Sequence, residues 1–362
     1  MNRALQQTEL YHYTTLGRSG LRVSPFSFGT GTFGQQWGES WSNDYGASKA
    51  VLAAYVDAGG NFLDTADIYH NGESEEITGK LVKELGGRDR FVIATKYTMA
   101  MDPNNPNKSG NGRLHMMAAV DASLRRLGTD YIDLFYTHWW DGLTPVEEVM
   151  QGMDTLVRSG KIRYVGMSNP PAWYFSKANM LALQHGRSPV IALQMQYNLL
   201  VRDIEEEYID AAKEYGTALL PWSPLANGLL SGKYTIDAEG KLMGKGRYVD
   251  SWVTDPSVDL KSPRTRNVLE VLRAVASEVG ASPAQVALNW VQNRAGVGAT
   301  IIGASRPEQV KDNVAALKIS LTEEQRQRLD DASAPPARYP YYLTTVHNKA
   351  SIIGKNPIKK WE

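Results

Sequence analysis

The chain has 362 residues, 42% of them hydrophobic, and its 39 Lys and Arg residues equal its 39 Asp and Glu residues in number. A formal net charge of zero gives no support to a protein steered broadly to nucleic acid or membranes. Because the sequence has no cysteine, disulfide frameworks and thiol chemistry are excluded. Neither a signal-peptide pattern nor an apolar run long enough to span a bilayer occurs, so we expect a cytoplasmic protein.

Short apolar segments alternate with amphipathic segments after an N-terminal hairpin that turns around residues 17–20. Strand-like runs occupy residues 21–30, 61–64, 91–96, 132–136, 162–167, 192–196, 218–222 and 300–302. Helical periodicity occupies residues 48–58, 74–85, 113–127, 145–159, 171–184, 204–214, 265–279, 283–293 and 307–316. Eight short strands, each apolar on both faces and separated by helices, predict a (β/α)8 TIM barrel of the α/β class.

We expect one domain over residues 1–362, with a barrel core over residues 13–333, extra C-terminal helices and a tail over residues 334–362. Two long loops, residues 97–112 and 223–261, follow barrel strands. Loops in that position line the active sites of such barrels. We expect both loops to border a substrate pocket, and the tail either joins them or is plain surface.

Three successive strand-like segments deliver ionisable side chains at their C-terminal ends. The first ends in Asp64 and is followed by Tyr69, the second reaches Lys96, and the third reaches His138. Each residue alone has a structural explanation, as a turn residue, a solvated strand end or a buried histidine. Together they lie where a (β/α)8 barrel places its active site, so the chain is predicted to be an enzyme.

A literal G-x-G-x-x-G follows the first strand, at Gly29, Gly31 and Gly34. The dinucleotide-binding fingerprint of this form requires a helix that opens inside the motif. The residues that follow are rich in Gly, Ser and Asn, and no helix is predicted before Ser48. These glycines are therefore expected to let the first barrel loop pass close to a ligand.

Eight motifs in register resemble the aldo-keto reductases. They are GTGTFG, DTADIYHNGESE, IATK, YTHWWD, YVGMSN, LQMQYN, WSPLANGLLSGKY and IIGASRPEQVKDN, and the resemblance covers residues 16–332. Within the family the chain is most similar to the aryl-alcohol-dehydrogenase-like and potassium-channel-β-subunit-like branches. The resemblance implies an NAD(P)H-dependent oxidoreductase that reduces an aldehyde or ketone to an alcohol.

The resemblance assigns Asp64, Tyr69, Lys96 and His138 to a catalytic tetrad. Tyrosine would donate the proton to the carbonyl oxygen, on which negative charge develops as hydride arrives. Tyrosine ordinarily ionises near pH 10, and a neighbouring ammonium favours its phenolate form. The aspartate would keep the lysine charged and oriented, and the histidine would hydrogen-bond the carbonyl oxygen.

The resemblance also assigns residues to a dinucleotide. Those matched to cofactor binding are Gly29, Thr30, Asp64, Ser168, Asn169, Gln194, Trp222, Ser223, Leu225, Gly228, Lys233, Gly303, Ser305, Arg306, Gln309 and Asn313. Ser168, Asn169 and Gln194 match residues that hold the nicotinamide carboxamide, and Trp222 matches an aromatic ring stacked on it. A guanidinium suits bidentate binding of a 2′-phosphate, so Arg306 favours NADPH, with NADH left possible.

Aromatic residues near the predicted mouth favour aromatic aldehydes or bulky ketones as substrates. The residues assigned to substrate binding are Phe33, Trp37, Tyr97 and Trp139. The six histidines are scattered without ligand spacing, so no metal site is expected.

The sequence is also compatible with two other functions. A redox-sensing regulatory subunit of the same fold would retain the tetrad but turn over slowly. A Schiff-base lyase would require a desolvated, uncharged Lys96, which Asp64 disfavours. The expected partner is a small-molecule carbonyl compound, without nucleic acid or membrane, and a homo-oligomer is possible.

Overall fold

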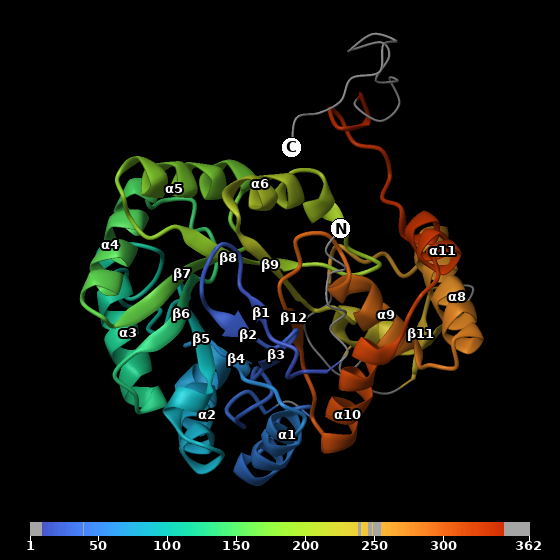
Figure 1. Cartoon of the computed structure of the whole chain (residues 1–362), viewed down its shortest axis with the longest axis horizontal. Helices are drawn as coiled ribbons and strands as arrows, with labels where there is room; N and C mark the ends of the chain where they lie inside the picture. The colour runs from blue at the N-terminus through green and yellow to red at the C-terminus, as the bar shows by residue number, and fades with distance from the viewer. Residues whose placement is uncertain (1–8, 39, 238–239, 245–247, 249–254, 344–362) are drawn as a thin grey trace.

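In the computed structural model, eight parallel strands form one curved sheet with helices around it (Figure 1). The structure describes residues 9–38, 40–237, 240–244, 248 and 255–343. The strands are β3 (Phe26–Gly29), β4 (Phe62–Asp64), β5 (Val92–Tyr97), β6 (Ile132–Thr137), β7 (Ile162–Ser168), β8 (Val190–Gln196), β9 (Ala218–Trp222) and β12 (Thr300–Ile302). The sheet runs from β12 through β3 to β9 in chain order, and a bridge between Leu219 and Val297 joins its two edges. The predicted (β/α)8 barrel is confirmed.

Helices cover the outside of the barrel (Figure 1). They are α1 (Tyr45–Asp57), α2 (Glu73–Glu84), α3 (Arg113–Leu127), α4 (Val146–Arg158), α5 (Ala172–Gln184), α6 (Tyr208–Tyr215), α9 (Pro283–Gln292) and α10 (Pro307–Ala315). Two more, α8 (Pro263–Glu278) and α11 (Glu323–Ser333), pack against each other beside α9. Capping residues fix the N-terminal ends of several helices. Ser282 and Gln285 form a reciprocal capping box that opens α9, and Thr322 and Gln325 form another that opens α11.

The predicted strand over residues 21–30 is divided into two. Its first part, β2 (Arg22–Val23), pairs antiparallel with β1 (Thr14–Thr15) in the expected hairpin, and its second part is barrel strand β3. Pro25 lies at the break and has no backbone N–H to contribute to a ladder. The predicted helix 204–214 is likewise divided into a 3₁₀ turn, η3 (Asp203–Glu205), and α6.

Two apolar layers fill the molecule. The inner cluster contains side chains that line the barrel, such as Phe62 and Leu134, together with Leu16 and Val23 of the hairpin region. The outer cluster lies between the strands and the helices. Because the β1–β2 hairpin contributes to the inner cluster, it covers the N-terminal end of the barrel.

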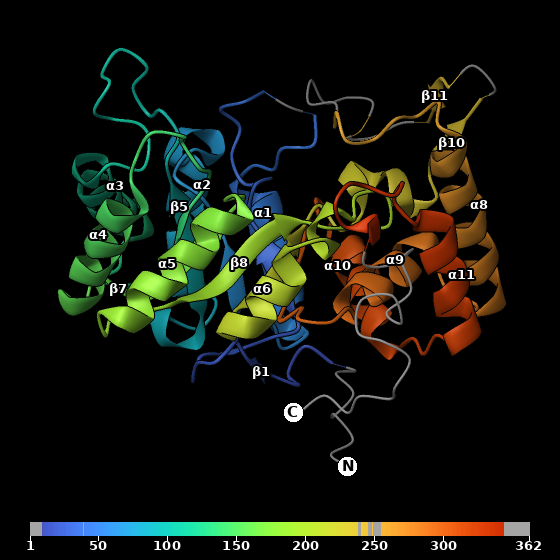
Figure 2. The same cartoon turned by 90° about the horizontal axis from the view of Figure 1, so that it is seen from above.

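The long loops rise at the opposite end. Figure 2 shows the hairpin on one side of the barrel, and the loop after β5 together with the short hairpin of β10 (Thr235–Ile236) and β11 (Leu242–Met243) on the other. This second end is where the strands terminate, so the fold leaves the predicted active-site end to be shaped by loops. Among the described residues, no helix is long and apolar enough to cross a membrane.

Candidate active site

Three of the predicted catalytic side chains meet at the C-terminal end of the barrel. Asp64 is the last residue of β4, Lys96 lies near the end of β5, and Tyr69 opens the short 3₁₀ helix η1 (Tyr69–Gly72). The Lys96 Nζ donates to Asp64 Oδ1 at 2.5 Å, to the carbonyl oxygen of Thr65 at 2.8 Å and to the Tyr69 hydroxyl at 3.4 Å. The ammonium therefore joins the carboxylate to the phenol.

His138 completes the group directly after β6. Its ring centroid lies 6.0 Å from that of Tyr69, and the two rings meet edge to face at 81°. Its backbone N–H donates to the carbonyl oxygen of Tyr97 at 2.8 Å, which extends the β5–β6 ladder and fixes the start of the loop. The structure thus brings all four predicted catalytic residues together.

Burial gives the lysine and the histidine different charge states. Burial alone would lower the pKa of Lys96, but the Asp64 carboxylate and the Tyr69 phenol outweigh it and raise that pKa above its usual value. Burial, and then the charge of Lys96, hold the pKa of His138 well below its usual range. At neutral pH the lysine is charged and the histidine is neutral, so the histidine can donate only one hydrogen bond from its ring.

Gln194 links the far side of the barrel to the tetrad. It lies on β8, and its Nε2 donates to Asp64 Oδ2 at 2.8 Å. Both carboxylate oxygens of Asp64 therefore have buried donors. The predicted carboxamide partner therefore binds the predicted catalytic aspartate, and Gln194 belongs to the hydrogen-bond network of the four predicted catalytic residues.

The ends of β7 and β9 bring together three residues predicted to hold the nicotinamide. Asn169 has a left-handed backbone, with φ 52°. Its Nδ2 donates to Ser168 Oγ at 2.9 Å and to the carbonyl oxygen of His138 at 3.2 Å. Its Oδ1 accepts from the Trp222 indole N–H at 3.1 Å. This network orients the Trp222 ring and the Asn169 amide beside His138.

The loop after β9 has a run of left-handed backbone conformations. Ser223 has φ 51°, and the consecutive residues Ala226, Asn227 and Gly228 have φ 47°, 53° and 95°. The backbone N–H groups of Ala226 and Gly228 donate to the carbonyl oxygens of Ser223 and Leu225, each at 2.9 Å, and so close this turn. A Cβ added to Gly228 would lie 3.3 Å from the Nζ of Lys233, so a cation borders the same turn. Leu225 is partly buried and packs against the core. Lys233 is therefore the group by which this loop could bind the predicted pyrophosphate.

The residues assigned to the adenosine end of the cofactor gather at the start of α10. Ser305 N–H donates to Gln309 Oε1 at 2.8 Å, and Asn313 Nδ2 donates to the carbonyl oxygen of Gly303 at 3.3 Å. Arg306 is the N-cap and is exposed. Helix N-terminal amides with an adjacent guanidinium suit a phosphate.

Aromatic side chains border Tyr69. Trp37 stacks on His70 with ring centroids 4.4 Å apart, and it meets Tyr69 and Trp41 edge-on, each at 6.2 Å. Trp139, next to His138, is 53% exposed. Trp37 thus gives the phenol an aromatic neighbour, of the kind that small-molecule sites use.

Comparisons with known proteins show the family of the chain. The model of the aldo/keto reductase family matches residues 25–334. The chain belongs to the aldo/keto reductase family. Among its relatives is the aryl-alcohol dehydrogenase [NADP(+)] of Phanerodontia chrysosporium, 36% identical, with 93% of this chain and 89% of the relative covered. Membership identifies the chain as an oxidoreductase.

Two further relatives of this aldo/keto reductase differ in their described roles. Norsolorinic acid reductase of Aspergillus flavus is 33% identical, with 91% of this chain and 83% of the relative covered. A potassium channel beta-subunit-like protein of Schizosaccharomyces pombe is 36% identical, with 87% of this chain and 91% of the relative covered. The resemblance to both branches of the family is therefore confirmed.

Some predicted ligand residues of the reductase are enclosed by the fold. Phe33 and Tyr97 are fully buried, and Tyr97 stacks on Phe135 with its hydroxyl donating to the Asn111 carbonyl oxygen at 3.1 Å. Since side chains alternate along a strand, Tyr97 faces the helices when Lys96 faces the barrel. The structure does not bring Phe33 or Tyr97 to the substrate side.

The start of the first barrel loop, at Gly29 and Thr30, also packs against neighbouring strands. Thr30 is fully buried and its backbone N–H donates to the carbonyl oxygen of Asp64 at 2.8 Å. Gly29 closes β3, where an added Cβ would lie 3.0 Å from a methyl of Ile301. Helix α1 begins at Tyr45, so no helix opens inside the glycine motif. The motif lacks the Rossmann geometry, as expected.

Sequence reasoning overlooked several contributors to the site. The carbonyl oxygen of Thr65 accepts a hydrogen bond from Lys96, and the His70 ring stacks on Trp37. The adjacency of His70 to Tyr69 was an available signal for its place near the phenol. The burial of Asp67 and its neighbours could not be predicted from the spacing of residues in the sequence.

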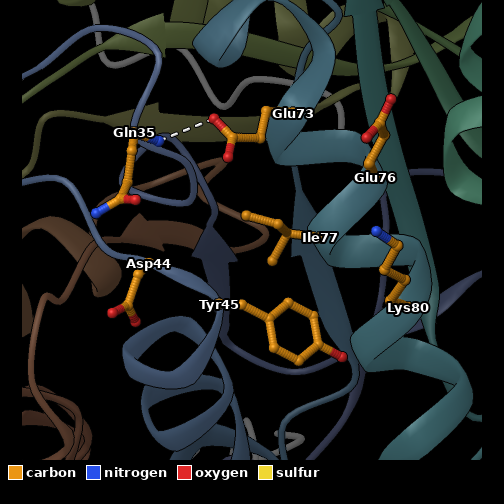
Figure 3. A pocket seen from close by; sticks show the side chains of 7 residues that line it. All are labelled: Gln35, Asp44, Tyr45, Glu73, Glu76, Ile77 and Lys80. Atoms are coloured by element: carbon orange, nitrogen blue, oxygen red, sulfur yellow. Dashed lines mark hydrogen bonds between the residues drawn. The ribbon is translucent and has the colours of Figure 1, made fainter.

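A cavity of about 560 Å³ lies between α1 and α2 (Figure 3). Its lining consists of Gln35, Asp44, Tyr45, Glu73, Glu76, Ile77 and Lys80. None of the predicted site residues lines it, and Glu73 Oε2 already accepts from the backbone N–H of Gln35 at 2.8 Å. In the described part of the chain, no three His, Cys, Asp or Glu side chains group as a metal site.

Proposed function

We propose that this aldo/keto reductase reduces an aldehyde or ketone to an alcohol with hydride from NADPH, and that Tyr69 donates the proton. The observation that carries the proposal is the buried ammonium of Lys96, held 2.5 Å from Asp64 and 3.4 Å from the Tyr69 hydroxyl. An ammonium there stabilises the phenolate that remains after the proton has left.

Each of the four predicted catalytic residues has a separate role in this reaction. When bound, the reduced nicotinamide supplies the hydride. Tyr69 gives its proton to the carbonyl oxygen, while Asp64 keeps Lys96 charged and directed at the phenol. Neutral His138 donates a hydrogen bond to the same oxygen and holds the carbonyl in line.

Distinct parts of the site support binding of NADP(H). Ser168, Asn169 and Trp222 hold the nicotinamide end, and the turn at residues 226–228 with Lys233 holds the pyrophosphate. Arg306 at the start of α10 pairs with the 2′-phosphate. The printed name of the Phanerodontia relative, which includes NADP(+), supports the same cofactor. NADH remains the weaker candidate.

The proposed substrates are aromatic or bulky carbonyl compounds. Trp37, Trp41 and Trp139 offer flat apolar surface near Tyr69 and His138. The names of the aryl-alcohol dehydrogenase and norsolorinic acid reductase relatives support the same class of substrate.

A Tyr69→Phe variant tests the proton donor. Removal of the general acid should lower kcat for aromatic aldehydes by about 10²–10⁴-fold, while the Kd for NADPH stays near that of the wild type. Steady-state oxidation of NADPH and fluorescence titration measure the two quantities. Tyr131→Phe is the matched control, because Tyr131 donates to Asp89 away from the site. Turnover retained in Tyr69→Phe would exclude Tyr69 as the donor.

A redox-sensing regulatory subunit is the second candidate, favoured by the similarity to the potassium channel beta-subunit-like protein. Such a subunit would hold its cofactor tightly and turn over slowly within a stable assembly. Rapid multiple turnovers with an aromatic aldehyde by the isolated chain would favour the enzyme. A single slow turnover with retained NADP⁺, over a full panel of carbonyl compounds, would favour the subunit.

A further inference from the structure

Asp67 is a buried carboxyl group in the turn that carries the proposed proton donor. It lies between β4 and η1, two residues before Tyr69, and its backbone N–H donates to the carbonyl oxygen of Lys96 at 3.1 Å. The residue is 1% exposed. Among the described residues, neither of its carboxyl oxygens has a hydrogen-bond partner. A carboxylate in this position would be both desolvated and unpaired.

The cations around Asp67 are already engaged with other carboxylates. On α3, Arg126 donates from Nε to Glu75 Oε2 at 2.6 Å, and fully buried Glu75 also accepts from Thr95 at 2.6 Å. On β5, Lys96 is engaged by Asp64. Two cations thus face three carboxyl groups, and the two hydrogen-bonded pairs leave Asp67 as the third. An isolated buried carboxyl group neutralises itself by keeping its proton.

We infer that Asp67 is a neutral carboxylic acid in the working enzyme and that its proton is required for carbonyl reduction. The inference rests on the proposed function. Reduction places negative charge on the carbonyl oxygen and on the Tyr69 phenol, and Lys96 stabilises that charge. An ionised Asp67 would compete for the same ammonium and add a second anion beside it. Asp67 is therefore a positioning residue that acts through Lys96.

The surroundings of Asp67 act on its pKa in both directions, and burial has the largest effect. Burial raises its pKa most, and the Glu75 carboxylate on α2 raises it further. Arg126 on α3, the nearby Ile68 amide and Lys96 on β5 lower it, and the result is a pKa of about 8. Asp67 thus keeps its proton at pH 7 and loses it as the pH rises to 9.

The pH profile of Asp67→Asn tests this role, because asparagine imitates the protonated acid at every pH. We measure kcat/KM for an aromatic aldehyde from pH 6 to 10 with saturating NADPH. A group that titrates near pH 8 keeps its proton in about a tenth of molecules at pH 9, so the wild-type value should fall about tenfold. In Asp67→Asn the alkaline decline should move up by at least one pH unit. If the pH profiles of the wild type and Asp67→Asn superimpose, the inference is overturned.

Asp133→Asn is the matched control. Asp133 is another poorly exposed carboxyl group whose pKa is raised by burial, but it pairs with Arg88 near the opposite end of β6 from His138. Its replacement should leave the alkaline decline of the wild type in place. A displacement equal to that of Asp67→Asn would show that the effect does not depend on proximity to Lys96, and would overturn the inference.

A second measurement needs neither substrate nor cofactor. Enzyme labelled with ¹³C at the Asp carboxyl carbon is titrated by NMR, and one signal should retain the shift of the protonated acid at pH 7 and change with a midpoint near pH 8. That signal should be missing from Asp67→Asn. If that variant does not fold, the wild-type spectrum decides, because the absence of any Asp signal titrating between pH 7 and 9 contradicts the inference. A failure of all carbonyl substrates would contradict the proposed function alone.

Discussion

Single side chains in the site differ in how firmly the fold holds them. Lys96, Asp64 and Gln194 are fixed by buried hydrogen bonds to one another. Arg306 is exposed, and its guanidinium has no hydrogen bond or ion pair within the described residues. A side chain held by so few contacts contributes little to folding, so its loss should change ligand binding with little change in stability.

Arg306→Ala should therefore change the choice between dinucleotides. A guanidinium that donates to a 2′-phosphate contributes about 1.5–3 kcal/mol when it is well shielded, and this exposed position should give about tenfold weaker NADPH binding. NADH lacks the phosphate, so its Kd should stay unchanged. Isothermal titration with both dinucleotides measures the difference.

Arg306→Lys is the informative companion variant. Lysine keeps the charge but lacks the planar donor pair, so NADPH affinity should fall between that of the wild type and that of Arg306→Ala. An equal loss of NADPH and NADH affinity in Arg306→Ala would show that the residue does not contact the 2′-phosphate.

At the scale of elements, unusual backbone conformations gather in the loops that follow barrel strands. The described non-glycine residues with positive φ are His70, Asn71, Thr98, Asn169, Ser223, Ala226 and Asn227. All of them follow β4, β5, β7 or β9. Such conformations cost free energy and persist where the surrounding structure imposes them, commonly at ligand sites. The loop after β9 has the densest run.

Gly228→Ala tests whether this run binds the cofactor. A left-handed conformation costs a residue with a side chain roughly 1–2 kcal/mol, and the new Cβ would press on Lys233 at 3.3 Å. Relaxation of the turn should weaken NADPH binding by about 5–30-fold. Fluorescence titration gives the Kd, and thermal unfolding gives the stability.

Gly280→Ala provides the control for backbone strain. Gly280 also has positive φ, 65°, but an added Cβ meets nothing within 4 Å, and the residue lies between α8 and α9. The Gly280→Ala variant should be less stable than the wild type but should bind NADPH with the same Kd. The same result for Gly228→Ala would remove the pyrophosphate role from the loop.

The helices and strands were largely predictable because each buries a periodic apolar face. The predicted helix over residues 113–127 coincides with α3, where Met116 and Val120 are buried and Gly128 ends the helix in a left-handed conformation. The division at Pro25 was not predicted, since the apolar run continues through it. Apolar periodicity predicts what is buried but does not divide one buried strand from the next.

The candidate site was predictable where its residues end strands, and less so where contacts come from distant helices. Asp64, Lys96 and His138 meet because parallel strands end at one edge. The surroundings of Asp67 depend on a pairing of Glu75 with Arg126, 51 residues apart. Strand alternation could have placed Tyr97 outside the barrel, but the aromatic content of the loops suggested the mouth.

At the scale of the whole molecule, a partly buried ion network joins the C-terminal helices to the barrel. Arg294, after α9, donates two hydrogen bonds of 2.9 Å to Asp330 of α11 and one of 3.3 Å to Glu205. Glu205 is the last residue of η3 and also accepts from Arg202, which donates to Ser333 of α11 at 2.8 Å. Charges from three segments therefore depend on one another.

Arg294→Met should destabilise the fold by removing the shared cation of this network. Exposed ion pairs contribute roughly 0–1 kcal/mol and the loss of one partner of a buried pair costs about 3–5 kcal/mol. Since the side chains of Arg294 and Asp330 are 25% and 26% exposed, we expect a loss of about 2 kcal/mol in the free energy of unfolding. For a chain of 362 residues this lowers the thermal midpoint by about 3 °C.

Arg328→Met on α11, the helix that carries Asp330, separates this effect from a general loss of charge. Arg328 binds both oxygens of Glu278 at 2.7 and 2.9 Å, but its side chain is 38% exposed. Water solvates the two charges when such an exposed pair is broken, so the loss in the free energy of unfolding should be less than about 1 kcal/mol. Calorimetry of both variants at low and high salt makes the comparison. Equal losses would mean that burial does not strengthen the network, and that apolar packing of α8, α9 and α11 alone holds the C-terminal helices to the barrel.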